Sequence, residues 1–406
     1  MTIARAAFPW HRPLRAALSA ALSGLAAVAP AREVPCPPAA AQRIERPTAA
    51  DGRLSVGWTH ERWSPDKLPD SAAKAADELL REAAGVQNTQ IMGWGLPSPL
   101  PSPDQPDFKA LDQRVDLMKR TARWPVLTLC CAPDWMKGGR AGETDWSRLA
   151  AAPLPEHFDD FARLAATVAQ RYPEVRHFLV WNELKGFWNP SSNRWDAVGY
   201  TTLYNKVYRA IKAVRPDALV GGPYVVMSSF RTDDALVSRH GSELSGAWGT
   251  VDRRALDVVQ YWLANKVGAD FVAVDGGVMP TKGALQTDSA AALGKFAAVN
   301  GWLKRRTDLP IWWAEFYPVP PTMSGDEAVA QLSRSLEVSE RSGASVVLFW
   351  NPACRSDVDY GSAACLWSSG TDTAIAPSAF ARTLARAPGG AVAASSSQGC
   401  ATDVQK

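Results

Sequence analysis

Short apolar segments alternate with longer amphipathic segments along most of the chain. Eight of the apolar segments have the length and composition of buried strands. We predict strands at Leu54–Trp58, Thr89–Gly93, Pro125–Cys131, His177–Trp181, Ala218–Gly222, Asp270–Val274, Pro310–Ala314 and Ser345–Trp350. Between them, apolar residues recur three and four positions apart, which predicts helices that bury one face. The clearest helices are at Phe108–Ala122, Phe158–Tyr172, Tyr200–Val214, Leu256–Val267, Ala290–Arg305 and Glu327–Ser342.

This alternation predicts the α/β class, with a parallel sheet covered by helices. The eight strand–helix units within residues 51–386 fit one (β/α)8 barrel with long loops. An open doubly wound sheet is the alternative, but no Gly-x-Gly-x-x-Gly motif follows the first strand. No repeat of the period typical of solenoids is present. We therefore predict a single barrel domain.

The first 31 residues have the pattern of a signal peptide. Three arginines, Arg5, Arg12 and Arg15, precede an Ala/Leu-rich run at 16–29, and Ala29-Pro30-Ala31 fits a cleavage site. The run is short and Ala-rich for a membrane span, although an uncleaved anchor is the alternative. We predict export, to a periplasmic or extracellular location.

The ends of the chain beyond the barrel differ from it in composition. Residues 32–50 are rich in Pro and Ala and are predicted to form a linker. Residues 387–406 are rich in Gly, Ala, Ser and Gln and are predicted to form a flexible tail.

Six cysteines fit an exported protein, in which disulfides are permitted. Cys354 and Cys365 bracket one loop and are predicted to pair. Cys36 and Cys400 lie in the two tails and could join the ends. Cys130 and Cys131 are adjacent within a predicted strand, and we expect them to stay reduced in the core.

Nothing in the composition indicates a metal, a cofactor or a polyanionic partner. The 406 residues carry a net charge of only +3, which gives no basic footprint for nucleic acid or an anionic membrane. The five His show no zinc-ligand spacing. Asp357-x-Asp359-x-Gly361 lacks the remaining ligands of a calcium loop and is predicted to be a polar turn.

Two glutamates follow predicted strands, Glu183 after the fourth and Glu315 after the seventh. Strands four and seven stand nearly opposite in a ring of eight, so both side chains can reach one point at the carboxyl ends. Paired carboxyls are the apparatus of glycoside hydrolysis, and a separation of about 5 Å implies retention of configuration. The alternative is that each glutamate caps a helix or pairs with an arginine.

The surrounding residues resemble glycoside hydrolase family 39. Trp181-Asn182-Glu183 with Phe187-Trp188 resembles its acid/base signature, and Glu315-Phe316 resembles its nucleophile segment. The resemblance is best between Pro125 and Pro223. It implies a retaining barrel hydrolase, with Glu183 as acid/base and Glu315 as nucleophile. It also implies that Asn182 binds the sugar 2-hydroxyl and that Trp350 forms the floor on which that sugar stacks.

Two positions depart from the family pattern. After the sixth strand the family usually has a His near a Tyr, whereas this chain has Val274-Asp275-Gly276-Gly277. Leu184 replaces the Pro that usually follows the acid/base. Both positions flank the expected sugar site, so the identity of the sugar is left open.

Other residues at the ends of predicted strands could contact sugar hydroxyls, because loops at this end of a barrel supply specificity. The candidates are His60, Trp135 and Tyr224, and more weakly Glu61, Trp94 and Asp134. A structural role for each is the alternative. The 17 Trp provide aromatic faces for sugars, although Trp also fills barrel cores.

Together these features predict a secreted, cofactor-free glycoside hydrolase that cleaves plant or microbial polysaccharide, similar to a β-xylosidase. A non-catalytic carbohydrate-binding barrel, an endo-acting exopolysaccharide hydrolase and a metal-dependent barrel hydrolase are the alternatives. The sequence leaves the linkage, exo or endo action and the oligomeric state open.

Overall fold

The computed structural model describes residues 53–354, 362–369 and 375–386. The predicted signal peptide, linker and tail lie outside the described residues. So do Cys36, Cys400 and the polar turn at Asp357, Asp359 and Gly361.

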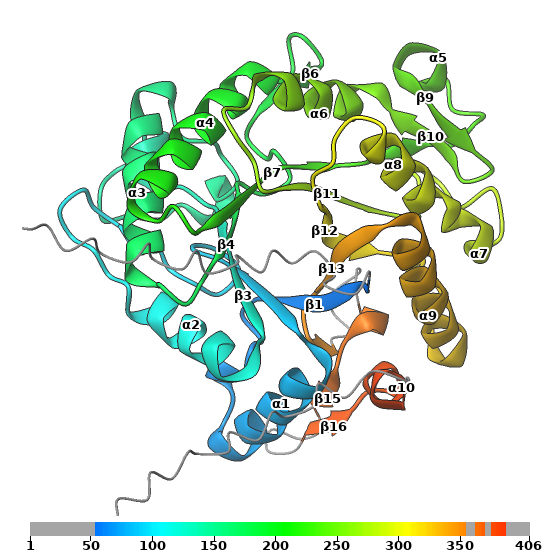
Figure 1. The fold of residues 1–406 in the computed structure, drawn as a ribbon, viewed down its shortest axis with the longest axis horizontal. Coiled ribbons are helices and arrows are strands. Elements are labelled where there is room, and N and C mark those ends of the chain that lie inside the picture. The colour runs from blue at the N-terminus through cyan, green and yellow to red at the C-terminus, as the bar shows by residue number, and fades with distance from the viewer. Residues whose placement is uncertain (1–52, 355–361, 370–374, 387–406) are drawn as a thin grey trace, which may run out of the picture. The chain divides into compact units, whose positions relative to one another are not determined.

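Eight parallel strands of the described chain close into a barrel (Figure 1). Each strand pairs with the next barrel strand along the chain, and the last pairs with the first, for example Gly57 with Leu348. The strands are β1 (Ser55–His60), β2 (Val86–Gln90), β3 (Trp124–Leu129), β4 (His177–Val180), β7 (Leu219–Val226), β11 (Phe271–Gly277), β12 (Ile311–Tyr317) and β13 (Ala344–Trp350). The predicted fold class is confirmed.

Helices surround this ring and connect its successive strands (Figure 1). They are α1 (Asp70–Ala83), α2 (Lys109–Thr121), α3 (Phe158–Arg171), α4 (Ala197–Val214), α6 (Arg253–Asn265), α8 (Gly294–Lys304) and α9 (Gly325–Ser342). Helix α3 illustrates their packing, because Phe158, Phe161, Ala165 and Val168 recur at helical spacing and are buried. No helix in the described part of the chain is long and apolar enough to cross a bilayer.

Smaller elements decorate the loops. The remaining helices are α5 (Val237–His240), α7 (Ser289–Ala292) and α10 (Ala379–Arg386). Short strands form three small sheets: β5 (Trp188–Asn189) with β6 (Arg194–Trp195); β8 (Ser229–Phe230), β9 (Gly241–Gly246) and β10 (Gly249–Asp252); and β14 (Ala353–Cys354), β15 (Trp367–Ser369) and β16 (Ile375–Pro377). Single 3-10 turns are η1 (Pro65–Lys67), η2 (Asp134–Lys137), η3 (Trp146–Arg148), η4 (Pro155–His157) and η5 (Ser362–Ala364).

The barrel has an inner core that is separate from the core between strands and helices. The inner core includes Leu179, Phe271, Trp312 and Val346. The Phe271 and Trp312 rings stack with their centroids 4.2 Å apart. Among the described residues, seven Trp are fully buried, namely Trp58, Trp181, Trp262, Trp302, Trp312, Trp313 and Trp367. Much of the high Trp content therefore fills the core.

The second strand begins three residues earlier than predicted, at Val86 rather than Thr89. Its residues are all buried, although four of the five are polar. Gln87, Asn88 and Thr89 form side-chain hydrogen bonds. Asn88 donates to Thr59 Oγ1 (3.1 Å) and accepts from Thr128 Oγ1 (2.9 Å). The prediction failed here because it required apolar residues, whereas a buried polar residue is tolerated once it is hydrogen-bonded.

Three later strands continue beyond their predicted ends. β7 extends to Val226, β11 to Gly277 and β12 to Tyr317. Tyr224, Asp275 and Glu315 consequently lie within strands rather than in the loops that follow. A strand fixes the direction of a side chain more firmly than a loop does, and this matters for the site below.

One cysteine prediction is confirmed and one is wrong. Cys354 and Cys365 form the predicted disulfide, with Cα atoms 4.9 Å apart. Cys130 and Cys131 are also paired, rather than reduced as predicted. The prediction assumed an extended strand, in which successive side chains point in opposite directions. β3 ends at Leu129, so the two cysteines follow the strand and their sulfur atoms can meet.

Replacing both Cys354 and Cys365 with Ser should lower the free energy of unfolding by about 2–3 kcal/mol. The reason is that the crosslink reduces the entropy of the unfolded chain. Urea unfolding of the oxidised proteins measures the loss. Ser368→Ala, at an exposed position of the adjoining strand β15, is the control and should change stability by less than about 0.5 kcal/mol. Peptide mapping that found both thiols free in the parent protein would contradict the pairing.

Candidate active site

Three carboxyl groups converge at the carboxyl-terminal end of the barrel. Glu315 lies in β12, Asp275 lies in β11, and Glu183 follows β4 by three positions. One carboxylate oxygen from each of the three lies within 4.8 Å of the others. The structure therefore brings together the two glutamates that the sequence singled out, and it adds the aspartate at which the family pattern breaks.

A left-handed turn presents Glu183. Trp181, Glu183 and Leu184 have φ angles of 68°, 50° and 49°. The turn is closed by two hydrogen bonds: the Lys185 amide donates to the Asn182 carbonyl (3.0 Å), and the Trp181 indole donates to the Lys185 carbonyl (2.7 Å). Such backbone conformations cost about 1–3 kcal/mol each and gather at functional sites. Leu184 adopts this conformation where the family pattern has Pro, whose φ is fixed near −65°.

Irregular pairing presents Asp275. The register between β11 and β12 shifts between Val274 and Asp275, and the register between β11 and β7 shifts between Ala273 and Val274. Such bulges change the direction in which the following side chain points. Tyr224, on the neighbouring strand β7, also has a left-handed φ, of 56°.

The Glu315 carboxylate is buried and is held at both oxygens. The Tyr224 hydroxyl donates to Oε1 (2.7 Å), and the Tyr317 hydroxyl donates to Oε2. Burial, and then the charge of Glu183, raise the pKa of Glu315 to about 7. Lys185 and the two tyrosine hydrogen bonds act in the opposite direction. The carboxyl is thus fixed in orientation but costly to ionise.

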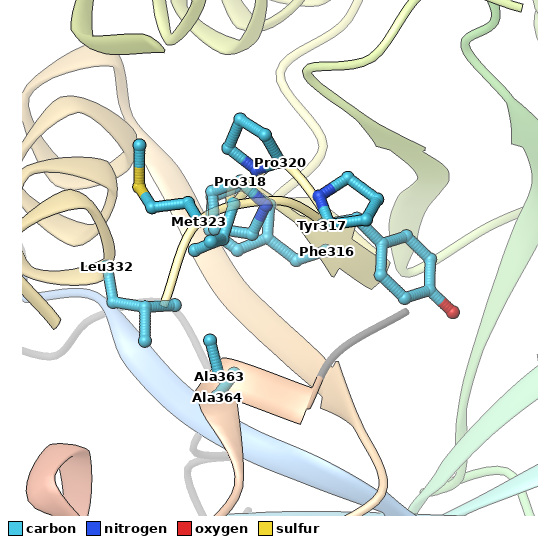
Figure 2. Close-up of a pocket in the computed structure, with 10 residues that line it drawn as sticks. Phe316, Tyr317, Pro318, Pro320, Met323, Leu332, Ala363 and Ala364 are labelled. Atoms are coloured by element: carbon cyan, nitrogen blue, oxygen red, sulfur yellow. The ribbon is translucent and has the colours of Figure 1, made fainter. Parts of the chain in front are cut away.

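Tyr317 also lines a small cavity at the end of β12 (Figure 2). Pro318, Pro320, Met323 and Ala363 are among the residues that line this cavity. In Figure 2 the Tyr317 hydroxyl points away from Pro320 and Met323. With a volume of about 20 Å³, the cavity has room for roughly one water molecule and not for a sugar.

Lys185 is the cation at the centre of the group. Its ammonium pairs with Glu183 and lies 5.4 Å from the centre of the Trp94 ring. Burial opposes its charge, but Glu183, Glu315 and Asp275 together outweigh burial and raise the pKa of the ammonium. Its side chain remains 42% exposed, against 17% for Glu183, so this is the side from which a ligand can approach.

Asn182 and Trp350 lie where the resemblance implies. Asn182 is buried, and its Nδ2 donates to Glu183 Oε2 (3.3 Å). Its Oδ1 is buried and has no hydrogen-bond partner among the described residues. Trp350 ends β13 half-buried, edge-on to Trp94 with ring centroids 5.7 Å apart. Their roles toward a sugar stay predictions.

Other predicted contact residues have partners within the protein. Both ring nitrogens of His60 are hydrogen-bonded, to Ser64 (2.8 Å) and Gln87 (2.9 Å), and burial lowers its pKa to about 4. The Trp135 indole donates to the Leu100 carbonyl (3.1 Å). Tyr224 reaches Glu315, as described above. A sugar contact by His60 or Trp135 stays a prediction.

The weaker candidates Glu61 and Asp134 are also buried. The Trp63 amide donates to Glu61 (3.3 Å), and burial raises the pKa of the Glu61 carboxyl. Asp134 pairs with Lys137 (3.1 Å) and accepts from the Asp145 amide (2.7 Å).

Sequence reasoning missed Lys185 and Tyr317. Tyr317 follows Glu315 by two positions, so a strand extended to Tyr317 would have put both on one face. Lys185 follows Glu183 by two positions in a turn, and no periodicity indicates its direction.

The three carboxyls are also close enough to share a cation. Lys185 already supplies positive charge there, and tyrosine hydroxyls occupy both oxygens of Glu315. These groups favour a site organised around protons, so we assign no metal to it.

No protein-family model and no curated protein matches the sequence. Solved structures do match the fold. A family 39 glycoside hydrolase from Bacteroides cellulosilyticus WH2 shares 15% identity over 82% of this chain and 63% of its own, with a TM-score of 0.52. The family 39 enzyme from Xanthomonas axonopodis pv. citri shares 19% sequence identity over 78% of this chain and 62% of its own, with a TM-score of 0.50.

The chain has the fold of family 39 glycoside hydrolases. It spans less than two thirds of the length of those two enzymes. The AHE enzyme from Alicyclobacillus herbarius is matched over 96% of its length and 82% of this chain, at 13% identity and a TM-score of 0.53. At these identities the likeness extends to the barrel, and the chemistry has to be argued from the side chains.

Replacing Tyr317 with Phe should raise the pKa of Glu315 by about one unit. The lost hydrogen bond favours the ionised carboxylate, so its removal favours the proton. Carboxyl ¹³C NMR of glutamate-labelled protein, with the Glu315 signal assigned from Glu315→Gln, measures the change. Tyr261→Phe, on helix α6, is the control and should leave the signal unchanged. A pKa that stayed constant or fell in the Tyr317 variant would contradict this account of the site.

Proposed function

We propose that this chain is a retaining glycoside hydrolase that acts on plant or microbial polysaccharide. The observation that carries the proposal is the approach of Glu183 and Glu315 to within 4.8 Å at the carboxyl end of the barrel. Retaining enzymes hold their two carboxyls about 5–5.5 Å apart, whereas inverting enzymes leave about 6.5–9.5 Å for a water molecule. The separation and the fold both favour retention.

Glu315 is the proposed nucleophile. Two tyrosine hydroxyls and a barrel strand fix its carboxylate, so little reorganisation is needed for attack. In the first step a Glu315 oxygen bonds to the anomeric carbon. The bond from that carbon to the leaving oxygen breaks, and the leaving oxygen takes the proton of Glu183.

Glu183 is the proposed acid/base because it is the more exposed of the pair and follows Asn182 in the turn. In the second step Glu183 takes a proton from water, the hydroxide attacks the anomeric carbon, and Glu315 leaves as a carboxylate. Asn182 and Trp350 are proposed to hold the sugar, as the family 39 resemblance implies, with the aromatic face of Trp350 stacking on the ring.

The substrate is proposed to be a β-xyloside or a related glycoside, and the protein is proposed to be exported. The Cys354–Cys365 disulfide fits an oxidising compartment. The resemblance of Trp181-Asn182-Glu183 to the family 39 acid/base signature supports a xyloside or a related glycoside. No cofactor is required by the mechanism.

Purified protein should hydrolyse at least one aryl glycoside in a panel of xyloside, arabinosides, glucoside, mannoside and galactoside. Activity should survive EDTA, because protons rather than a metal organise the site. Release of the aryl group measures turnover. Binding of sugars without turnover would favour a non-catalytic barrel, and loss of activity in EDTA would favour a metal-dependent hydrolase.

Activity on that substrate should fall as the pH drops below about 7. Glu315 must be ionised to attack, and its raised pKa means that it gains a proton in this range. The pH dependence of kcat/KM measures the acidic limb. A limb near the ordinary glutamate value would show that Glu315 is ionised more easily than its burial implies.

Azide should distinguish the roles of the two glutamates. Glu315→Ala should lose turnover on every substrate, whereas Glu183→Ala should lose least activity on substrates with good leaving groups. With azide, Glu183→Ala should give a glycosyl azide of retained configuration, because azide attacks the glycosyl ester. Glu315→Ala should give the inverted azide. NMR of the products measures the configuration, and the opposite pattern would exchange the two roles.

A further inference from the structure

Asp275 is a third carboxyl that the two-carboxylate mechanism does not use. It is 1% exposed and lies at the bulge of β11. One of its carboxyl oxygens lies within 4.8 Å of a carboxyl oxygen of Glu183. Its Oδ2 is buried and has no hydrogen-bond partner among the described residues. A buried ionised carboxylate with an unpartnered oxygen is costly, so this geometry favours the neutral acid.

The charged and titratable groups around Asp275 lead to the same conclusion. Glu183, in the turn after β4, and Glu315, in β12, contribute negative charge. The hydroxyls of Tyr224 and Tyr317 are directed to Glu315. Lys185 is paired with Glu183 rather than with Asp275. Burial, and then the charges of Glu315 and Glu183, raise the pKa of Asp275 well above its usual value.

A second lysine lies behind Asp275 on α8 but does not neutralise it. The Lys295 ammonium donates to the Gly277 carbonyl (2.7 Å) and to Ser229 Oγ (3.1 Å). Burial lowers the pKa of this ammonium to about 7. The three carboxyls therefore have one directly paired ammonium, so they hold at least one proton between them.

We propose that Asp275 is a positioning residue that keeps its proton and donates it in a hydrogen bond to Glu183. The proposal rests on the function proposed above. After Glu183 has given its own proton to the leaving oxygen, the hydrogen bond from Asp275 stabilises the resulting carboxylate and keeps it aimed at the incoming water. The Asp275 proton is not transferred, so every proton in the two-step reaction is still accounted for by Glu183 and water.

Asp275→Asn and Asp275→Ala separate this role from the alternatives. The amide of Asn still donates to Glu183, so Asp275→Asn should keep kcat/KM within about threefold of the parent and leave its pH profile in place. Asp275→Ala removes the donor. It should lower kcat about 10- to 100-fold and move the alkaline limb to higher pH, because the Glu183 carboxylate loses a stabilising partner.

The direction in which the alkaline limb of the pH profile shifts tests whether Asp275 is protonated. If Asp275 were ionised, both variants would remove a negative charge from beside Glu183, and both alkaline limbs would move to lower pH. If Asp275 only filled space, both variants would lose activity with no shift. Either result overturns the proposal. Asp77→Asn replaces another buried carboxyl, on α1, and is the matched control with an unchanged profile.

Carboxyl ¹³C NMR measures the protonation of Asp275 directly and does not require enzymatic activity. In aspartate-labelled full-length protein, the signal that Asp275→Asn removes should keep the chemical shift of a protonated acid at pH 6, where an ordinary aspartate is ionised. An ionised shift at pH 6 would overturn the proposal, even if Asp275→Ala failed to fold. Inactivity of the parent on every glycoside would instead overturn the proposed function and leave this measurement to decide the proton on Asp275.

Discussion

Electrostatic repulsion among Glu183, Asp275 and Glu315 is the constraint on which the rest of the site depends. Three carboxyls within 4.8 Å of one another, two of them buried, cannot all ionise without compensation. Lys185 compensates Glu183 by its charge, and Tyr224 and Tyr317 compensate Glu315 by hydrogen bonds. For Asp275, protonation is the remaining way to remove the negative charge. The same repulsion would favour one protonated and one ionised glutamate, as the proposed acid and nucleophile require.

The closed barrel makes this arrangement possible because it fixes the backbone around the three carboxyls. Four consecutive strands of the ring carry or precede the site residues, in the order β4, β7, β11 and β12. Their carboxyl ends lie at the same end of the barrel. Irregularities are concentrated there: register shifts in β11, and left-handed residues at Trp181, Glu183 and Tyr224. The stacked inner core below, including Phe271 and Trp312, holds the strands against this strain.

The fold and the side chains support the proposed chemistry in different ways. The likeness to family 39 structures concerns the barrel, at identities of 15% and 19%. The side chains carry the rest: a glutamate pair at retaining distance, an asparagine with an unpaired oxygen, and Trp94 and Trp350 edge to face beside a cation. Asp275 and Lys185 are features of this chain's own site. They indicate that its proton chemistry is arranged differently from what the family pattern alone would imply.

The sequence by itself determined the barrel, since periodicity records which face of each element is buried. It also located Glu183 and Glu315, because a carboxyl that ends an apolar run is visible without coordinates. It misplaced the start of β2, whose residues are mostly polar, and it missed the Cys130–Cys131 bond, whose two cysteines follow the end of β3 at Leu129. The contacts of Asp275, Lys185 and Tyr317 were decided by tertiary structure alone. Bulges and left-handed turns set the direction of a side chain, and they arise from packing between strands that are distant in the sequence.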